Sequence, residues 1–104
     1  MVANQLSQEG NVYDRILKRM REKIRTRQYV MTLHAEEEMD NDNLSIFDVE
    51  RGVLTGRIIE RQKDHATAEW KYLVEGETIA GSLVIVVVKL SVTGKLVIIT
   101  VYLV

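Results

Sequence analysis

The chain has 104 residues, a net charge of −1 and no cysteine. This length predicts one domain with a modest core, and the absence of cysteine excludes a disulfide framework, a thiolate zinc site and a cysteine nucleophile. The balanced net charge excludes a molecule that attracts polyanions over its whole surface, so any such attraction must come from a local patch.

Residues 1–10 are polar and predict a flexible N-terminus before a single domain over residues 11–104. They lack the apolar stretch of a secretory signal, and the apolar run over residues 83–90 is too short to cross a bilayer as a helix. We therefore expect a cytoplasmic protein without a membrane partner. Asn11 is expected to cap the first helix, whose apolar stripe recurs every four residues. The stripe consists of Val12, Ile16, Met20 and Ile24.

The charges are sorted by sign along the chain. Seven of the 14 basic residues lie within residues 15–27, and seven of the 15 acidic residues lie within residues 36–50. This asymmetry indicates either two solvated helix faces that pair with each other or an interaction patch. The basic helix, with Arg19 and Lys23, can follow an RNA backbone, and it can equally bind a membrane surface or an acidic antitoxin segment. No aromatic residue is interleaved among its cations to stack on bases.

Residues 28–31 form a short extended segment, and Thr32 follows as the expected N-cap of a second helix. This helix carries His34 near its start and three consecutive glutamates, which suit the positive end of a helix dipole. The polar residues 41–43 predict the loop that ends the helix.

Ser45 and Asp48 have the spacing of a capping box, in which a serine and a carboxylate three residues later bond each other's backbone N–H groups. They predict a third helix that starts directly after Ser45. Gly52 near its end and Gly56 after it are expected to stop this helix.

Strand patterns fill the rest of the chain. Residues 57–63 and 69–75 flank a polar turn that contains His65, and residues 82–90 are apolar enough for a central strand covered on both faces. A turn ending in glycine precedes the last strand, residues 95–104. Helices followed by hairpin-linked strands predict an α+β domain with an antiparallel sheet of four or five strands. One face of such a sheet stays open and offers a place for a site.

Seven short segments recur in the order expected of one known family. The segments are residues 29–35 (YVMTLHA), 44–46, 48–50, 58–60, 71–72, 84–88 and 99–102. Together, over residues 28–102, they resemble the family known as domain of unknown function 4258. The resemblance implies kinship with the RelE, BrnT and MqsR ribonuclease toxins. It therefore implies a RelE/MqsR-like fold, an RNA substrate and an antitoxin partner.

The resemblance has one departure. The family pattern places an arginine after its His-Ala pair and before a methionine, whereas this chain has Glu38 before Met39. If the arginine contacts phosphate in relatives, the charge is reversed here. This reversal motivates an alternative expectation, that of a decayed toxin or a non-catalytic interaction module.

Cleavage of RNA without a metal needs a group that activates the ribose 2′-hydroxyl, a cation for the phosphorane and a proton for the leaving oxygen. The candidates for proton transfer are His34, His65, Lys71 and Tyr102. The candidates for RNA binding are Arg57, Arg61, Lys89, Arg19 and Lys23. His34 and Glu38 also have the spacing of two metal ligands on a helix face. Because no third ligand is evident, we expect neither a metal nor a cofactor.

Each candidate has a structural interpretation as well. His34 can fix its helix against the sheet, and His65 can be an ordinary turn residue. Lys71 can serve solubility, and Tyr102 can be a core tyrosine with its hydroxyl at the rim. The end of the last strand, residues 97–104, carries no charge and must be covered or paired, either within the sheet or across a homodimer.

Overall fold

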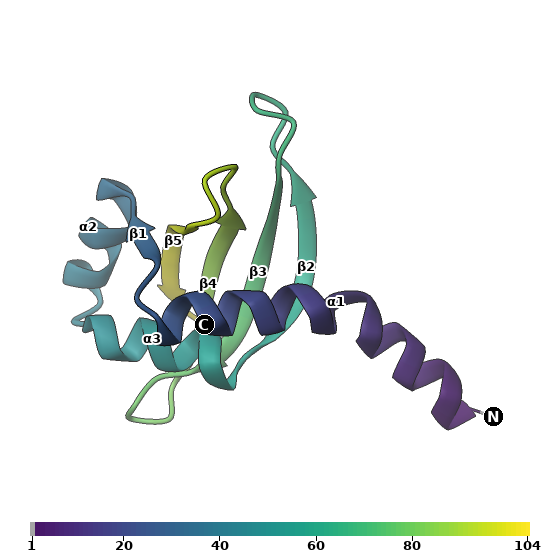
Figure 1. The fold of residues 1–104 in the computed structure, drawn as a ribbon. Helices are drawn as coiled ribbons and strands as arrows, with labels where there is room; N and C mark the ends of the chain where they lie inside the picture. The colour runs from purple at the N-terminus through teal and green to yellow at the C-terminus, as the bar shows by residue number, and fades with distance from the viewer. Residues whose placement is uncertain (1) are drawn as a thin grey trace.

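A computed structural model describes residues 2–104, with side chains from Val12 onward. The elements in chain order (Figure 1) are α1 (Val2–Arg25), β1 (Tyr29–Met31), α2 (Leu33–Asn41), α3 (Ile46–Thr55), β2 (Arg57–Lys63), β3 (Trp70–Glu77), β4 (Leu83–Leu90) and β5 (Leu96–Leu103). The predicted α+β class is confirmed. The five strands agree with the upper end of the predicted range.

The five strands form one sheet in the order β1-β5-β4-β3-β2. Strands β2 to β5 pair antiparallel, but β1 pairs parallel to β5, with Tyr29 opposite Leu96 and Met31 opposite Ile98. The expectation of a wholly antiparallel sheet is therefore wrong at β1. Strands joined by a tight hairpin must run antiparallel, whereas β1 reaches β5 through the whole intervening chain, which leaves its direction free. Strand β4 is central, as predicted.

The three helices bury their apolar faces against one side of the sheet. The buried helix residues are Leu17, Met20, Ile24, Ala35, Met39, Val49 and Val53. The buried strand residues are Tyr72, Val74, Val84, Val86, Val88, Leu96, Ile98 and Val101. Complete burial of one such aliphatic side chain contributes about 1.5–3 kcal/mol, so this layer is the main source of stability. The alternation predicted around residues 70–74 is confirmed, since Tyr72 and Val74 face the helices.

Helix α1 starts earlier than the sequence predicted. Its backbone is helical from Val2, so Asn11 lies inside the helix and does not cap it. Val12, the first residue of the predicted stripe, is 67% exposed, and only the later stripe residues reach the core. Figure 1 shows the first turns of α1 extending past the sheet. The predicted flexibility of residues 1–10 concerns a segment whose side chains, and Met1 entirely, lie outside the described residues.

Gly52 is a packing residue and not the expected stop signal. It is buried inside α3, where an added Cβ would lie 2.8 Å from Cγ1 of Val84. A Cβ on Gly76 of β3 would overlap the carbonyl oxygen of Gly52. Helix α3 therefore lies backbone against backbone on β3, which only glycine permits. Gly56 does end the helix, as its C-cap.

The capping box of α3 is confirmed and also holds a distant loop. Ser45 N donates to Oδ2 of Asp48 (2.9 Å), and Asp48 N donates to Oγ of Ser45 (3.3 Å). The second carboxylate oxygen of Asp48 accepts from Ile79 N in the β3–β4 loop (3.0 Å). These backbone bonds, to Ser45 first and then to Ile79, lower the pKa of Asp48 below its usual range. One carboxylate thus starts a helix and anchors a loop.

Candidate functional site

Four exposed cations form a row on the solvent face of α1. Arg15, Lys18, Arg19 and Arg25, together with Glu22, line a surface hollow of about 500 Å³. Their spacing of three and four residues places them on one face of the helix. With one carboxylate among four cations, the row keeps a strong positive potential, which favours an anionic ligand. We call these five residues the basic stripe.

Two other cations of α1 have structural partners instead. Arg21 Nη2 donates to the carbonyl oxygen of Gly56 (2.8 Å), which ties α1 to the end of α3. Lys23 Nζ donates to Oε1 of Gln28 (3.0 Å) and does not line the hollow. Of the two RNA-binding candidates in this helix, the structure therefore places Arg19 in the basic stripe and Lys23 outside it.

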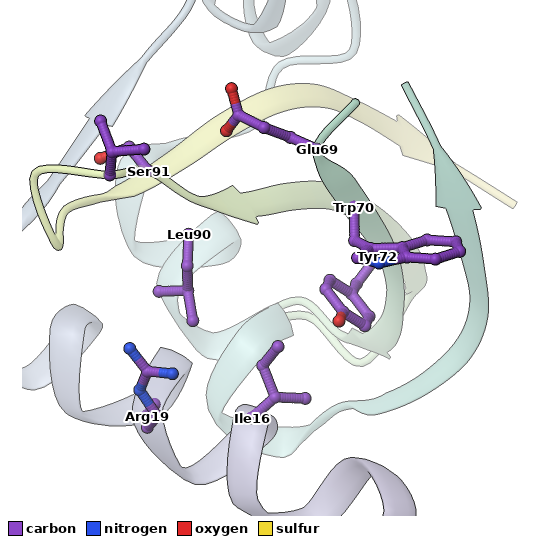
Figure 2. A pocket seen from close by; sticks show the side chains of 8 residues that line it. Ile16, Arg19, Glu69, Trp70, Tyr72, Leu90 and Ser91 are labelled. Carbon is purple, nitrogen blue, oxygen red and sulfur yellow. The ribbon is translucent and has the colours of Figure 1, made fainter. Parts of the chain in front are cut away.

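A second hollow of about 370 Å³ lies between α1 and the neighbouring ends of β3 and β4. Figure 2 shows Ile16 of α1 facing Tyr72 of β3 and Arg19 below Leu90, while the Trp70 ring extends toward the neighbouring strand β2. The lining is completed by Glu69, Ser91 and Val92. We call this hollow the Trp70 pocket. Arg19 lines both hollows, so the basic stripe and the Trp70 pocket form one continuous surface.

Two cations lie over the aromatic ring of Trp70. The Arg61 guanidinium lies 4.0 Å from the ring centroid and the Lys63 ammonium 5.8 Å from it. Both come from β2, in which Lys63 is opposite Trp70 and Arg61 is opposite Tyr72. Arg61, predicted as a phosphate ligand, is therefore brought to an aromatic residue that the sequence analysis did not select. The matching alternation of residues 61–63 and 70–72 was the signal that could have found this group.

Lys71 and Lys89 lie on the other, open face of the sheet, among carboxylates. Lys89 Nζ is 3.7 Å from Oε1 of Glu69. The pKa of Asp64 is lowered, first by the backbone N–H of Ala66 and to a smaller extent by Thr67 N–H and by the charges of Lys71 and Lys89. The two lysines are therefore partly neutralised by their surroundings.

Arg57 and Tyr102 occupy the opposite end of that open face. Arg57 Nη2 lies 3.9 Å from Oε1 of Glu75, and Glu75, Ile85 and Tyr102 follow one another across the strands. On β4, Ile85 and Lys89 are four residues apart, which corresponds to about 13 Å along a strand. Tyr102 and the two lysines therefore do not converge on one atom.

His34 belongs to a network that docks α2 on β5. Its Nε2 is 3.2 Å from Oε1 of Glu38, which accepts from the backbone N–H of Val101 (3.2 Å). Thr32 caps α2 by accepting from Ala35 N (3.1 Å), as predicted, and its hydroxyl donates to the carbonyl oxygen of Ile99 (2.8 Å). Thr32 and Glu38 thus fix the helix to the sheet, and His34, with a side chain 65% exposed, holds Glu38 from outside.

His65 is far from this network. It is exposed in the turn between β2 and β3, whereas α2 packs on β5, which is two strands from β3 and three from β2. Two to three strand spacings correspond to about 10–14 Å. His34, Tyr102 and the pair of His65 and Lys71 near the β2–β3 turn therefore lie at three separate places, so the four candidates do not form one cluster.

Within residues 2–104, no helix is long and apolar enough to cross a membrane. Over the same residues, no three side chains of His, Cys, Asp or Glu are grouped in a way that could hold a metal ion. The acidic groups described above engage backbone N–H groups and cations instead.

A family model described as "Domain of unknown function (DUF4258)" matches residues 31–103. The matched range contains β1's last residue and every later helix and strand, so it includes Trp70, Arg61 and the α2–β5 network but leaves out the basic stripe. The chain has no match among curated proteins or among solved structures.

Proposed function

Because this chain belongs to the DUF4258 family, we propose that it is a toxin-type endoribonuclease with a RelE/MqsR-like fold. The enzyme cleaves messenger RNA without a metal or cofactor, and an antitoxin protein inhibits it. The observation that carries the proposal is the continuous surface formed by the basic stripe and the Trp70 pocket. This surface combines a row of cations with the exposed ring of Trp70.

The basic stripe supplies the means to hold RNA. Arg15, Lys18, Arg19 and Arg25 can each replace a counterion of a phosphate, an interaction that reads no sequence and weakens with salt. Because the stripe lies outside the family match, this contribution to RNA affinity comes from the N-terminal helix and not from the family domain. The family domain contributes most of the Trp70 pocket, which an RNA strand bound along the basic stripe can reach.

The Trp70 pocket supplies one group suited to the reaction. Arg19 lines the pocket and can neutralise the charge of the phosphorane, whereas the Glu69 carboxylate is paired with Lys89 on the other face of the sheet. Attack of the 2′ oxygen on phosphorus releases the 5′ oxygen, and the acceptor and the donor of the two protons are sought among the candidates of the sequence analysis. The products are a 2′,3′-cyclic phosphate and a 5′-hydroxyl. Roles for His34, His65, Lys71 and Tyr102 stay predictions.

Expression from a tightly repressed promoter tests the proposal. We expect growth arrest together with new, discrete 5′ ends in cellular RNA mapped by primer extension. Arg19→Glu is expected to abolish both effects. Arg51→Glu makes the same charge change on an exposed residue of α3 and is expected to leave both effects intact. Normal growth with intact RNA in the presence of soluble, folded protein would refute the ribonuclease.

A second candidate is a non-catalytic module or decayed toxin that binds an antitoxin or a second copy of itself. The separation of the four candidates for proton transfer favours it, and so does the exposure of Leu83, Tyr102, Leu103 and Val104 at one end of the sheet. Light scattering at high protein concentration separates the variants, because a strict monomer removes the homodimer.

A further inference from the structure

We propose that Trp70, backed by Arg61, is a stacking seat for one unpaired base of single-stranded RNA, with Arg19 on the neighbouring phosphate. The inference deepens the proposed function, on which it rests for the identity of the ligand. It adds which form of RNA is bound and which residue selects it.

The exposure of Trp70 is the first observation. The indole is 42% exposed although Tyr72, two residues along the same face, is buried. The Trp70 ring lines an open hollow and not the core. A large exposed aromatic ring next to a hollow is a common mark of a binding surface.

The charge around the ring is the second observation. Arg61 and Lys63 lie over the ring at 4.0 and 5.8 Å from its centroid, and Arg19 lines the same pocket. The single carboxylate of the pocket, Glu69, has Lys89 at 3.7 Å. An aromatic face among several cations matches a nucleotide, which offers a π face and a phosphate together.

The pocket also has an apolar floor that can contact the ring of a base. Ile16, Tyr72 and Leu90 contribute the apolar surface of this floor, whereas Val92 is 96% exposed and belongs to the outer edge of the lining. The volume of about 370 Å³ falls in the range of small-ligand sites, roughly 300–1,000 Å³. A base inside a duplex is stacked on both sides and cannot enter such a pocket, so the seat selects single strands.

The pairing of Arg61 with Trp70 has a structural interpretation as well. A cation over an exposed indole also stabilises a hairpin, and that purpose would be met without any ligand. A purely structural pair predicts that replacement of Trp70 changes stability only. A stacking seat predicts that RNA affinity depends on the aromatic ring itself, so that phenylalanine replaces tryptophan and leucine does not.

The experiment uses the fluorescence of Trp70, which is the single tryptophan of the chain. The full chain is titrated with a short 2′-O-methyl oligoribonucleotide, which cannot be cleaved because its 2′ oxygens are blocked, and with a duplex of the same length. We expect quenching by the single strand and at least about tenfold weaker binding of the duplex.

Two variants complete the test, with affinity measured by anisotropy of a labelled strand. Trp70→Leu is expected to weaken binding about tenfold, and Trp70→Phe to stay within about threefold of the parent chain. Absence of quenching, or equal affinity of Trp70→Leu and the parent, overturns the inference. If RNA is still cleaved in that case, the ribonuclease stands without the seat. Quenching without new 5′ ends in cells leaves the seat in place and refutes the ribonuclease.

Discussion

Glu38 accepts a hydrogen bond from the backbone N–H of Val101, with Oε1 and N separated by 3.2 Å. The bond lies just past the point where β1 stops pairing with β5, because the last β1 pair is Met31 with Ile98. Beyond the end of β1, the Glu38 side chain thus takes the place of a strand by accepting a hydrogen bond from the backbone of β5. The charge reversal noted in the sequence has a structural use, and it does not by itself indicate a lost activity.

Replacement of Glu38 by arginine is therefore expected to destabilise the fold. Arginine has no acceptor for the Val101 N–H, and an unsatisfied buried donor costs about 1–3 kcal/mol. Glu38→Gln keeps an oxygen acceptor and is expected to cost less than half as much. Urea unfolding of both variants measures the difference. Equal midpoints for Glu38→Arg and the parent chain would show that the bond to Val101 contributes nothing.

Gly76→Ala is expected to be among the most disruptive single changes in the chain. The new Cβ would overlap the carbonyl oxygen of Gly52, so α3 would have to move away from β3, at a cost of about 3 kcal/mol or more. Gly81→Ala is the control. It has no atom within 4 Å of the new Cβ and only the strain of a positive φ of 86°, which costs about 1 kcal/mol. Thermal unfolding compares the two, and similar losses would contradict the close helix–strand contact.

Ionisation of Tyr29 is expected to lower the free energy of unfolding at alkaline pH. Burial and then the hydrogen bond to Oε2 of Glu50 (2.5 Å) raise the pKa of Tyr29 from 10.0 to about 12. The folded state therefore holds a proton that the unfolded state releases. The stabilisation is complete below pH 10 and is lost as the pH rises towards 12. Urea midpoints measured across this range should fall in the parent chain and fall less in Tyr29→Phe. Parallel curves would exclude this linkage.

The basic stripe predicts a specific salt dependence of RNA binding. Each phosphate contact to single-stranded nucleic acid contributes about 0.7 to the slope of log affinity against log salt. Arg19→Gln should lower the slope by about that amount. Arg21→Gln, two residues away, should leave the slope unchanged and lower stability instead, because Arg21 donates to the carbonyl oxygen of Gly56. Identical slopes for Arg19→Gln and the parent would remove Arg19 from the RNA path.

The parts of the fold that depend on neighbours in sequence were predictable. The Thr32 cap, the Ser45–Asp48 box and the alternation around Trp70 are confirmed because each uses residues within a few positions. The start of α1 was misjudged because polar residues and Gly10 do not prevent a helix. Gly52 was misread because a glycine near a helix end has the same pattern whether it stops the helix or packs it.

The parts that depend on distant segments were not predictable. The parallel pairing of Tyr29 with Leu96 joins residues far apart in the chain, and no local pattern sets its direction. The Trp70 pocket joins α1, β3 and the end of β4, and Arg61 reaches its ring only because of the β2–β3 register. In the sequence, Glu38 could be interpreted only as a departure from the family's arginine. Its partner is a backbone N–H of β5, and no sequence pattern indicates that such a group lies nearby.

The parallel pairing of β1 with β5 also has a consequence for biosynthesis. Residues 29–31 find their partner strand only when residues 96–98 have been made, and β4 likewise lacks one neighbour until then. A nascent chain on the ribosome that stops short of β5 leaves Val86 and Val88 with partners on β3 but without those on β5, and the docking site of α2 does not exist. Long-range contacts of this kind delay folding until the distant segment emerges. The sheet is therefore complete, with β1 paired and α2 docked, only after β5 has been translated.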